Sequence, residues 1–110
     1  MEKGPSTYAE YWTSEYAEVD HYKRHGKQMG FENNIQSYSK KAKEFAMEEN
    51  DNIISFTANE LKHYSTYKYN KETNEFMIIS RDGKIVTYFP PKDGIEYFYE
   101  QYEKWGAHWN

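Results

Sequence analysis

The chain has 110 residues, a formal net charge of −4 and no cysteine. This length suits a single domain, and the lack of cysteine excludes disulfides, thiolate metal sites and cysteine nucleophiles. The negative charge weighs against a protein that holds nucleic acid by overall charge attraction, because that mode needs an excess of lysine and arginine.

Residues 1–6 show no apolar periodicity and are interpreted as a linker or a cloning remnant, which leaves residues 7–110 as one domain. The Pro-Ser-Thr segment at 5–7 can begin a helix, and Gly26 and Gly30 supply stop signals. Between them, aromatic residues recur at helical spacing. The sequence therefore predicts a first helix whose aromatic side contains Tyr8, Tyr11, Trp12 and Tyr16.

A second helix is predicted to start after Asn33 or Asn34, whose side chains suit the N-cap position. The apolar residues that follow recur with the period of one helix face, and Lys40, Lys41 and Lys43 fall mainly outside that face. The predicted stripe consists of Ile35, Tyr38, Ala42, Phe45 and Ala46.

From residue 53 onward, the pattern changes to short runs rich in β-branched and aromatic residues. Asp82-Gly83 suits a tight hairpin turn, and residues 70–74 suit another turn. Pro90-Pro91 ends the series, because proline cannot donate a ladder hydrogen bond. The predicted strands are 53–56, 65–69, 76–79 and 85–89.

A final short amphipathic helix is predicted from Ile95 to Trp105. No repeat, heptad array or low-complexity linker interrupts the chain. The predicted fold is therefore α+β: N-terminal helices packed on a mostly antiparallel four- to five-stranded sheet, with a short C-terminal helix.

His21, Arg24 and His25 lie three and four residues apart, so they share one face near the end of the first helix. Imidazole transfers protons near neutral pH, and guanidinium suits a phosphate with developing charge. These residues are therefore a candidate set for cleaving a phosphodiester. The octet that begins at His21 contains no acid, and its Lys23 and Lys27 are predicted substrate contacts.

Two other interpretations of this segment remain open. Cations are favoured near a helix C-terminus by the helix dipole, so the histidines can be a surface feature without chemistry. Histidines one turn apart can also share a metal ion, but no third ligand is specified, because His63 and His108 lie in unrelated segments. We therefore expect no metal ligands.

Further candidates lie in the predicted strands. Strand alternation places Thr87 on the sheet face of Ile85 and Phe89, where a threonine is most simply a packing residue. A strand lysine can hold a phosphate, although an exposed structural lysine is commoner, and tyrosines can stack on RNA bases. The predicted phosphate contact is Lys68, and the predicted base-stacking contacts are Tyr69 and Tyr88.

Two separated motifs resemble a family of C-terminal nuclease domains of bacterial polymorphic toxins. The first reads His, aromatic, any residue, basic, His-Gly, and residues 21–26 fit it, followed by Gly30-Phe31, Tyr38 and Ala42. The second contains Tyr69-Asn70, Thr73-Asn74-Glu75-Phe76, Asp82-Gly83-Lys84-Ile85, Thr87-Tyr88-Phe89-Pro90-Pro91, Gly94 and Tyr97. The resemblance covers about residues 19 to 99.

Such domains are found at the ends of contact-dependent inhibition proteins, Rhs proteins and LXG toxins, and they are similar to the barnase, EndoU, colicin and RelE nucleases. The resemblance implies a small α+β fold and a metal-independent endoribonuclease that needs no cofactor and cleaves tRNA or rRNA. It also implies attack by the ribose 2′-hydroxyl on the adjacent phosphorus, which leaves a 2′,3′-cyclic phosphate and a 5′-hydroxyl.

In this resemblance, His21 matches a leading histidine that acts as general acid or base, and His25 matches a second histidine, catalytic or structural. Arg24 takes a position that is commonly lysine and would stabilise the phosphorane-like transition state. Thr87 would hydrogen-bond the scissile phosphate. The chain departs from the pattern at Pro90, where a lysine is usual, and this removes one expected phosphate contact.

The resemblance further implies an RNA substrate, N-terminal delivery domains of a longer parent protein, and an acidic immunity protein that covers the active cleft. The domain would be secreted as part of a larger toxin and act in the cytoplasm of the target cell. No apolar run approaches the roughly 20 residues of a membrane span, so we expect no membrane partner.

Two other functions remain open. An acidic, tyrosine-rich domain of this size can itself be a non-enzymatic immunity protein or a phage adaptor. The second function is that of a DNase toxin, although no cluster of acids in the sequence resembles a metal-bound nuclease centre.

Overall fold

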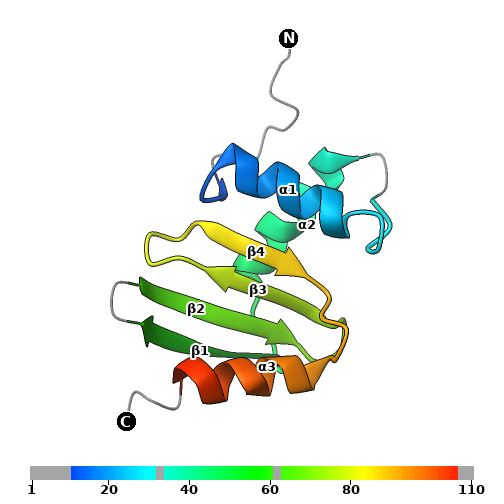
Figure 1. The fold of residues 1–110 in the computed structure, drawn as a ribbon. Helices are drawn as coiled ribbons and strands as arrows, with labels where there is room; N and C mark the ends of the chain where they lie inside the picture. Colours follow the sequence, from blue (N-terminus) through cyan, green and yellow to red (C-terminus); the bar gives the residue numbers. More distant parts are fainter. Residues whose placement is uncertain (1–10, 32–33, 61–62, 107–110) are drawn as a thin grey trace.

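The computed structural model describes residues 11–31, 34–60 and 63–106 (Figure 1). Two helices are followed by a four-stranded sheet and a closing helix, so the predicted α+β class is confirmed. The strands are neighbours in chain order and each pair is antiparallel, which makes the sheet a meander. The elements are α1 Glu15–His25, α2 Ile35–Met47, β1 Ile53–Glu60, β2 His63–Asn70, β3 Glu75–Ile79, β4 Ile85–Phe89, α3 Ile95–Gln101 and a π-helical turn, Tyr102–Gly106.

Helix α1 does not include the first of the aromatic positions predicted for it. Ser14 has an extended backbone, and its hydroxyl accepts a hydrogen bond from Ala17 N at 3.0 Å, so Ser14 is the N-cap. Trp12 instead forms a parallel bridge with Ile85, and Thr13 N donates to Ile85 O at 3.0 Å. A predicted helix through Trp12 is therefore wrong, because this backbone pairs with β4. The predicted start at 5–7 lies outside the described residues.

The second predicted helix is confirmed as α2. Asn34 is its N-cap, and the Asn34 side-chain oxygen accepts from Ser37 N at 2.9 Å, whereas Asn33 lies outside the described residues. Tyr38 donates its hydroxyl proton to the carbonyl of Tyr88 at 2.6 Å, which ties the helix to the sheet. The fully buried members of the predicted stripe are Tyr38, Ala42 and Phe45.

The predicted strands and turns are confirmed, although β1 and β2 are longer than predicted. Their ladder continues to the pair Glu60 and His63, since backbone pairing does not require apolar side chains. In the predicted Asp-Gly turn, Gly83 has a φ of 85° and its N–H donates to Ser80 O at 2.9 Å. The final helix is also present, as α3 and the π-helical turn.

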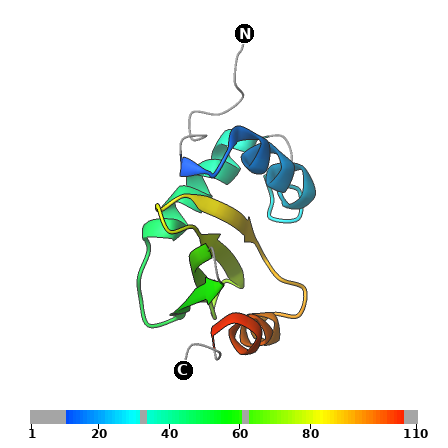
Figure 2. The same ribbon diagram turned by 60° about the vertical axis from the view of Figure 1, so that its left-hand side comes forward.

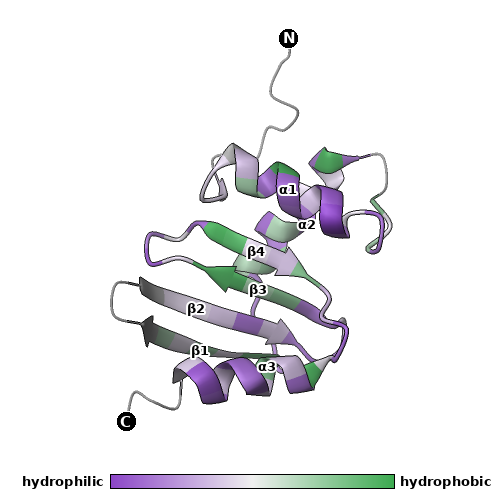
Figure 3. Ribbon diagram, viewed as in Figure 1, coloured by the Kyte–Doolittle hydropathy of each residue, from purple (hydrophilic) through white to green (hydrophobic). Residues whose placement is uncertain are grey.

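The sheet carries a cluster of buried side chains on each face. One cluster joins Met77 and Tyr88 to α2 and Trp12. The other packs Tyr67 and Phe76 against Phe98 of α3. Figures 1 and 2 show α1 and α2 beside β4 and α3 beside β1, and Figure 3 shows strongly apolar ribbon in β3 and β4. Helix α1 therefore covers the edge strand β4, which it contacts.

An irregularity in β4 places Thr87 and Ile85 on opposite faces of the sheet. The register pairs Thr87 with Ile78 but Ile85 with Ile79, so one extra residue is inserted between Ile85 and Thr87. Such a bulge moves the residues before it to the opposite face. Ile85 accordingly packs with the α2 cluster, whereas Phe89 packs with the α3 cluster. The prediction that Thr87 shares a face with Ile85 is wrong, and the shared face with Phe89 is retained.

Lys68 of β2 is buried beneath the C-terminal end of α2. Its ammonium group donates to the carbonyl oxygens of Ala46 at 3.2 Å and Glu48 at 2.5 Å, and it lies 3.3 Å from the Glu49 carboxylate. The last carbonyls of a helix have no partner within the helix, so a cation here satisfies them. Lys68 therefore joins α2 to the sheet.

Replacing Lys68 tests this role. Lys68→Met leaves two carbonyls without their donor, and we expect it to lower the free energy of unfolding by about 2–4 kcal/mol in a urea titration. Lys40 on the exposed side of α2 gives the matched control, and Lys40→Met should change stability by less than about 0.5 kcal/mol. Equal losses in the two variants would contradict a structural role for Lys68.

Candidate functional site

The predicted histidines lie on the side of α1 that meets β4. The rings of His21 and His25 are stacked with centroids 6.1 Å apart. His25 also stacks on Phe89 of β4 at 4.9 Å, with an angle of 20° between the rings, and His21 lies 5.9 Å from the Trp12 ring. Because Trp12 bridges Ile85, α1 and the residues before it meet β4 at its first residue and at its last. The site is therefore held by packing at both ends.

Hydrogen bonds define which nitrogen of His21 carries its proton. Nδ1 lies 2.8 Å from the carbonyl oxygen of Ala17, which can only accept, so Nδ1 is the donor. Nε2 lies 3.2 Å from Nη2 of Arg24, which can only donate, so Nε2 is the acceptor. This assignment leaves the ring neutral, with its lone pair directed at the guanidinium group.

Arg24 is shared between His21 and an acid that the sequence interpretation left out. Its Nε and Nη2 lie 3.1 and 2.7 Å from one carboxylate oxygen of Asp20, one turn earlier in α1. The octet from His21 contains no acid, but Asp20 immediately precedes it. The Arg24 side chain remains 56% exposed, so a phosphate can reach it from solvent.

His25 is partly covered by its contact with β4. Burial lowers the pKa of His25 from its ordinary value of 6.5, the hydrogen bond to Gln28 opposes this change, and the positive charge of Arg24 adds to it. Nδ1 lies 3.3 Å from the amide oxygen of Gln28, so Nδ1 is the donor and Nε2 keeps the lone pair. His25 is thus an uncharged base at neutral pH.

Thr87 lies in β4 between the two points at which α1 and its preceding residues touch that strand. Trp12 pairs with Ile85 on one side, and His25 stacks on Phe89 on the other. Thr87 shares the sheet face of Phe89 and is 9% exposed. The structure therefore brings Thr87 to the same part of the molecule as His21, Arg24 and His25.

Three predicted substrate contacts belong to the core instead. Lys68 is satisfied by the end of α2, and Tyr88 is fully buried with its hydroxyl on the Glu75 carboxylate. Tyr69 is packed beneath Phe98, and its hydroxyl donates to Asn74 at 2.6 Å. The expectation that these side chains contact substrate is corrected, because none offers a surface on which a base or phosphate can rest. Lys23 and Lys27 are exposed beside the histidines.

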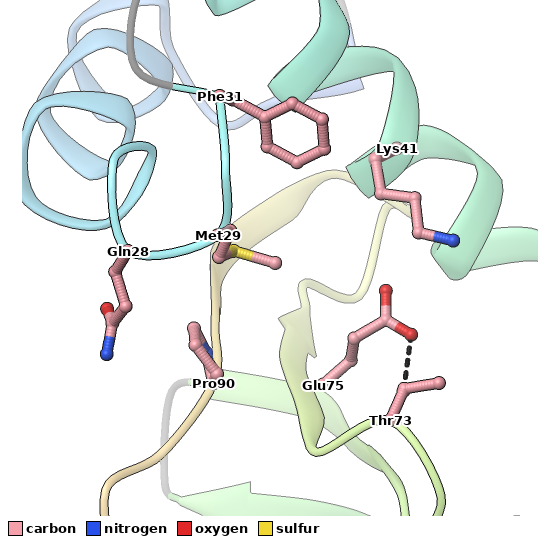
Figure 4. Close-up of a pocket in the computed structure, with 7 residues that line it drawn as sticks. All are labelled: Gln28, Met29, Phe31, Lys41, Thr73, Glu75 and Pro90. Carbon is pink, nitrogen blue, oxygen red and sulfur yellow. Dashed lines mark hydrogen bonds between the residues drawn. The ribbon is translucent and has the colours of Figure 1, made fainter.

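A pocket of about 300 Å³ adjoins His25 and was not expected from the sequence (Figure 4). Gln28, which contacts His25, forms part of its wall, and Pro90 follows the Phe89 ring on which His25 stacks. The one feature of the sequence analysis that touches this pocket is the position of Glu75 within the second motif. The lining residues are Gln28, Met29, Phe31, Lys41, Thr73, Glu75 and Pro90.

Comparison with protein-family models and with curated proteins finds no match to this sequence. Within the described part of the chain, no group of three or more histidine, aspartate or glutamate side chains is placed to hold a metal ion. His108 and the side chain of His63 lie outside that part. No helix in the described ranges is both long and apolar enough to cross a membrane.

The covering of His25 can be tested by NMR titration of its ring protons. Wild-type His25 should titrate below pH 6.5, because burial disfavours the charged form. Phe89→Leu removes the stacked ring and should raise the pKa towards 6.5, whereas Gln28→Ala removes a bond that favours the charged form and should lower it further. Shifts in the same direction in both variants would contradict these contacts.

Proposed function

We propose that this protein is a metal-independent endoribonuclease, the toxin domain of a larger secreted protein. The observation that carries the proposal is the cluster formed by two stacked imidazoles and a guanidinium group, which His25 joins to β4 through Phe89. Two proton-transfer groups and a cation are the set needed for attack by a 2′-hydroxyl on the neighbouring phosphorus. The resemblance of the two sequence motifs to toxin nucleases supports the same activity.

In the proposed reaction, His25 is the general base. Its lowered pKa leaves Nε2 unprotonated at neutral pH, which suits removal of the proton from the 2′-hydroxyl. The oxygen so activated forms a bond to phosphorus, and the bond from phosphorus to the 5′-oxygen breaks. The products are a 2′,3′-cyclic phosphate and a 5′-hydroxyl.

His21 and Arg24 act on the other side of the phosphate. A bound phosphate draws the Arg24 guanidinium away from His21 Nε2. Nε2 then takes up a proton from solvent and gives it to the leaving 5′-oxygen, while the proton that His25 removed returns to solvent. The guanidinium stabilises the charge that grows on the phosphate oxygens, and the Thr87 hydroxyl donates to one of them. Lys23 and Lys27 extend the cationic surface to neighbouring phosphates.

The proposal includes the biological setting that the motifs imply. The domain acts in the cytoplasm of a competing bacterium, and an immunity protein covers the histidines in the producing cell. A partner with an acidic surface fits the cluster of Lys23, Arg24 and Lys27, and opposite charges would speed its association. Expression without that partner should arrest growth.

Purified protein incubated with RNA in EDTA tests the reaction. Cleavage should proceed and leave 2′,3′-cyclic phosphate ends, while DNA stays intact. His21→Ala and His25→Ala should each slow cleavage by about 10²–10⁴-fold, the usual contribution of a proton-transfer group. Cleavage that needs a divalent metal, or that survives both substitutions, would contradict the proposal.

The two arginines of the chain allow a matched comparison. Arg24→Gln should slow RNA cleavage by about 100-fold, as expected when one group that stabilises transition-state charge is lost. Arg81 lies in the turn between β3 and β4, and Arg81→Gln should leave the rate within about twofold of wild type, a change of less than 0.5 kcal/mol. Equal effects would mean that overall charge, not the position of Arg24, matters.

A further inference from the structure

The outer side of α3 and of the π-helical turn carries two large aromatic side chains in solvent. Tyr99 is 52% exposed and Tyr102 is 42% exposed, although the same helix buries Phe98 against the sheet. An exposed tyrosine ring leaves apolar area in water, and tyrosine is enriched where proteins bind one another. Three exposed glutamates alternate with these rings, and we call the five residues the α3 outer face: Glu96, Tyr99, Glu100, Tyr102 and Glu103.

The charges of this face are not arranged to stabilise the helix. Glu96 and Glu100 are four residues apart, Glu100 and Glu103 are three apart, and like charges at these spacings repel. Glu103 also lies near the C-terminal end, where the helix dipole disfavours negative charge. Within the described part of the chain, none of the three carboxylates forms an ion pair. Choices that break a local rule without a structural gain are expected at functional sites.

A hollow in this face is lined by one tyrosine and three glutamates. Its volume is about 260 Å³, and the lining residues are Glu96, Tyr99, Glu100 and Glu103. Pockets for small molecules begin at about 300 Å³, so this hollow suits a long side chain of a partner better than a whole ligand. Lys104 lies 6.0 Å from the Trp105 ring and does not line the hollow. The charged groups around the hollow are therefore all negative.

We propose that the α3 outer face binds an arginine-rich segment of another protein. Guanidinium is planar, so it can lie flat on a tyrosine ring while its edge pairs with a carboxylate. The face offers both contacts at one place, because Glu96 and Glu103 lie one turn to either side of Tyr99. Lysine fits this arrangement less well, since its ammonium group is compact and strongly hydrated. The glutamates therefore select a basic partner, and the rings select arginine over lysine.

A second copy of the chain fits the face less well than a basic protein. The basic segment at residues 21–28 contains a single arginine, Arg24, and that side chain already pairs with Asp20 at 2.7 Å. Two copies that met through the α3 outer face itself would bring like charges together. The net charge of −4 adds repulsion between copies. These charges favour a different protein as the occupant.

The α3 outer face lies away from the candidate active site. Figures 1 and 2 show α1 and α3 at opposite ends of the molecule, with the sheet between them. A segment held on α3 therefore leaves the histidines of α1 open. The inference does not rest on the proposed ribonuclease, and it adds a second surface through which the protein meets a partner.

Two peptides of equal length and charge, hexa-arginine and hexa-lysine, test the inference in NMR titrations of the full chain. The salt concentration should be about 150 mM, which screens contacts that depend on charge alone. We expect hexa-arginine to bind at least about fivefold more tightly, as expected for stacking of a cation on an exposed ring. The largest amide shifts should fall in residues 96–104. Equal affinities, or largest shifts elsewhere, would overturn the inference.

Variants separate the effect of the rings from that of the charges. Tyr99→Ser should remove the preference for arginine, whereas Tyr16→Ser, at the still more exposed tyrosine of α1, should retain it. Glu100→Gln should weaken the binding of both peptides, with Glu44→Gln on the exposed side of α2 as its control. All four side chains are exposed, so we expect the variants to fold. An arginine preference that survives in Tyr99→Ser would overturn the inference.

Two further measurements identify other uses of this face. Sedimentation should give wild type and Tyr99→Ser the same mass at every concentration. Self-association that Tyr99→Ser abolishes would assign the face to a second copy and overturn the inference. Tyr99→Ser should also cleave RNA at the wild-type rate, and loss of cleavage would assign the face to the nuclease site instead. Preferential binding of hexa-arginine by a protein that cleaves no RNA would overturn the ribonuclease but leave this inference intact.

Discussion

The contact between α1 and β4 is the constraint on which the candidate site depends. At one end, Trp12 pairs with Ile85, and at the other the ring of His25 stacks on Phe89. Thr87 and Phe89 share one face of the sheet, and the bulge before Thr87 places Ile85 on the opposite face, where it packs near Trp12. The same stacking covers His25 and lowers its pKa.

A core rich in aromatic residues, including four buried tyrosines among the described residues, keeps these elements in place. Because each buried hydroxyl needs a partner, the tyrosines tie distant parts of the chain together. Tyr38 joins α2 to the carbonyl of Tyr88, and Tyr88 in turn holds Glu75 at the pocket. The fully buried Glu18 accepts a hydrogen bond from Ser39 and links α1 to α2. The residues that fix the fold thus also orient the groups that line the candidate site and its pocket.

Periodicity predicted α2, all four strands and the final helix, because their buried sides follow the period of each structure. It also predicted that His21, Arg24 and His25 share a face. It could not predict the bulge in β4, since strand alternation assumes a regular register, nor the pairing of Trp12 with Ile85, which depends on a contact distant in sequence. Lys68 and Tyr88 were expected to contact substrate, Lys68 through its charge and Tyr88 through its ring. Their partners, the end of α2 and Glu75, become visible only when the chain is folded.

The central claim is that RNA is held where the end of α1 meets β4. The most direct test is to follow the backbone amide signals of the protein by NMR while adding a short RNA with 2′-fluoro sugars, which binds but cannot cyclise. The account predicts that the largest shifts occur at residues 21–28 and 87–90. Shifts confined to α3 or to the β1–β2 hairpin, or no binding at all, would contradict it.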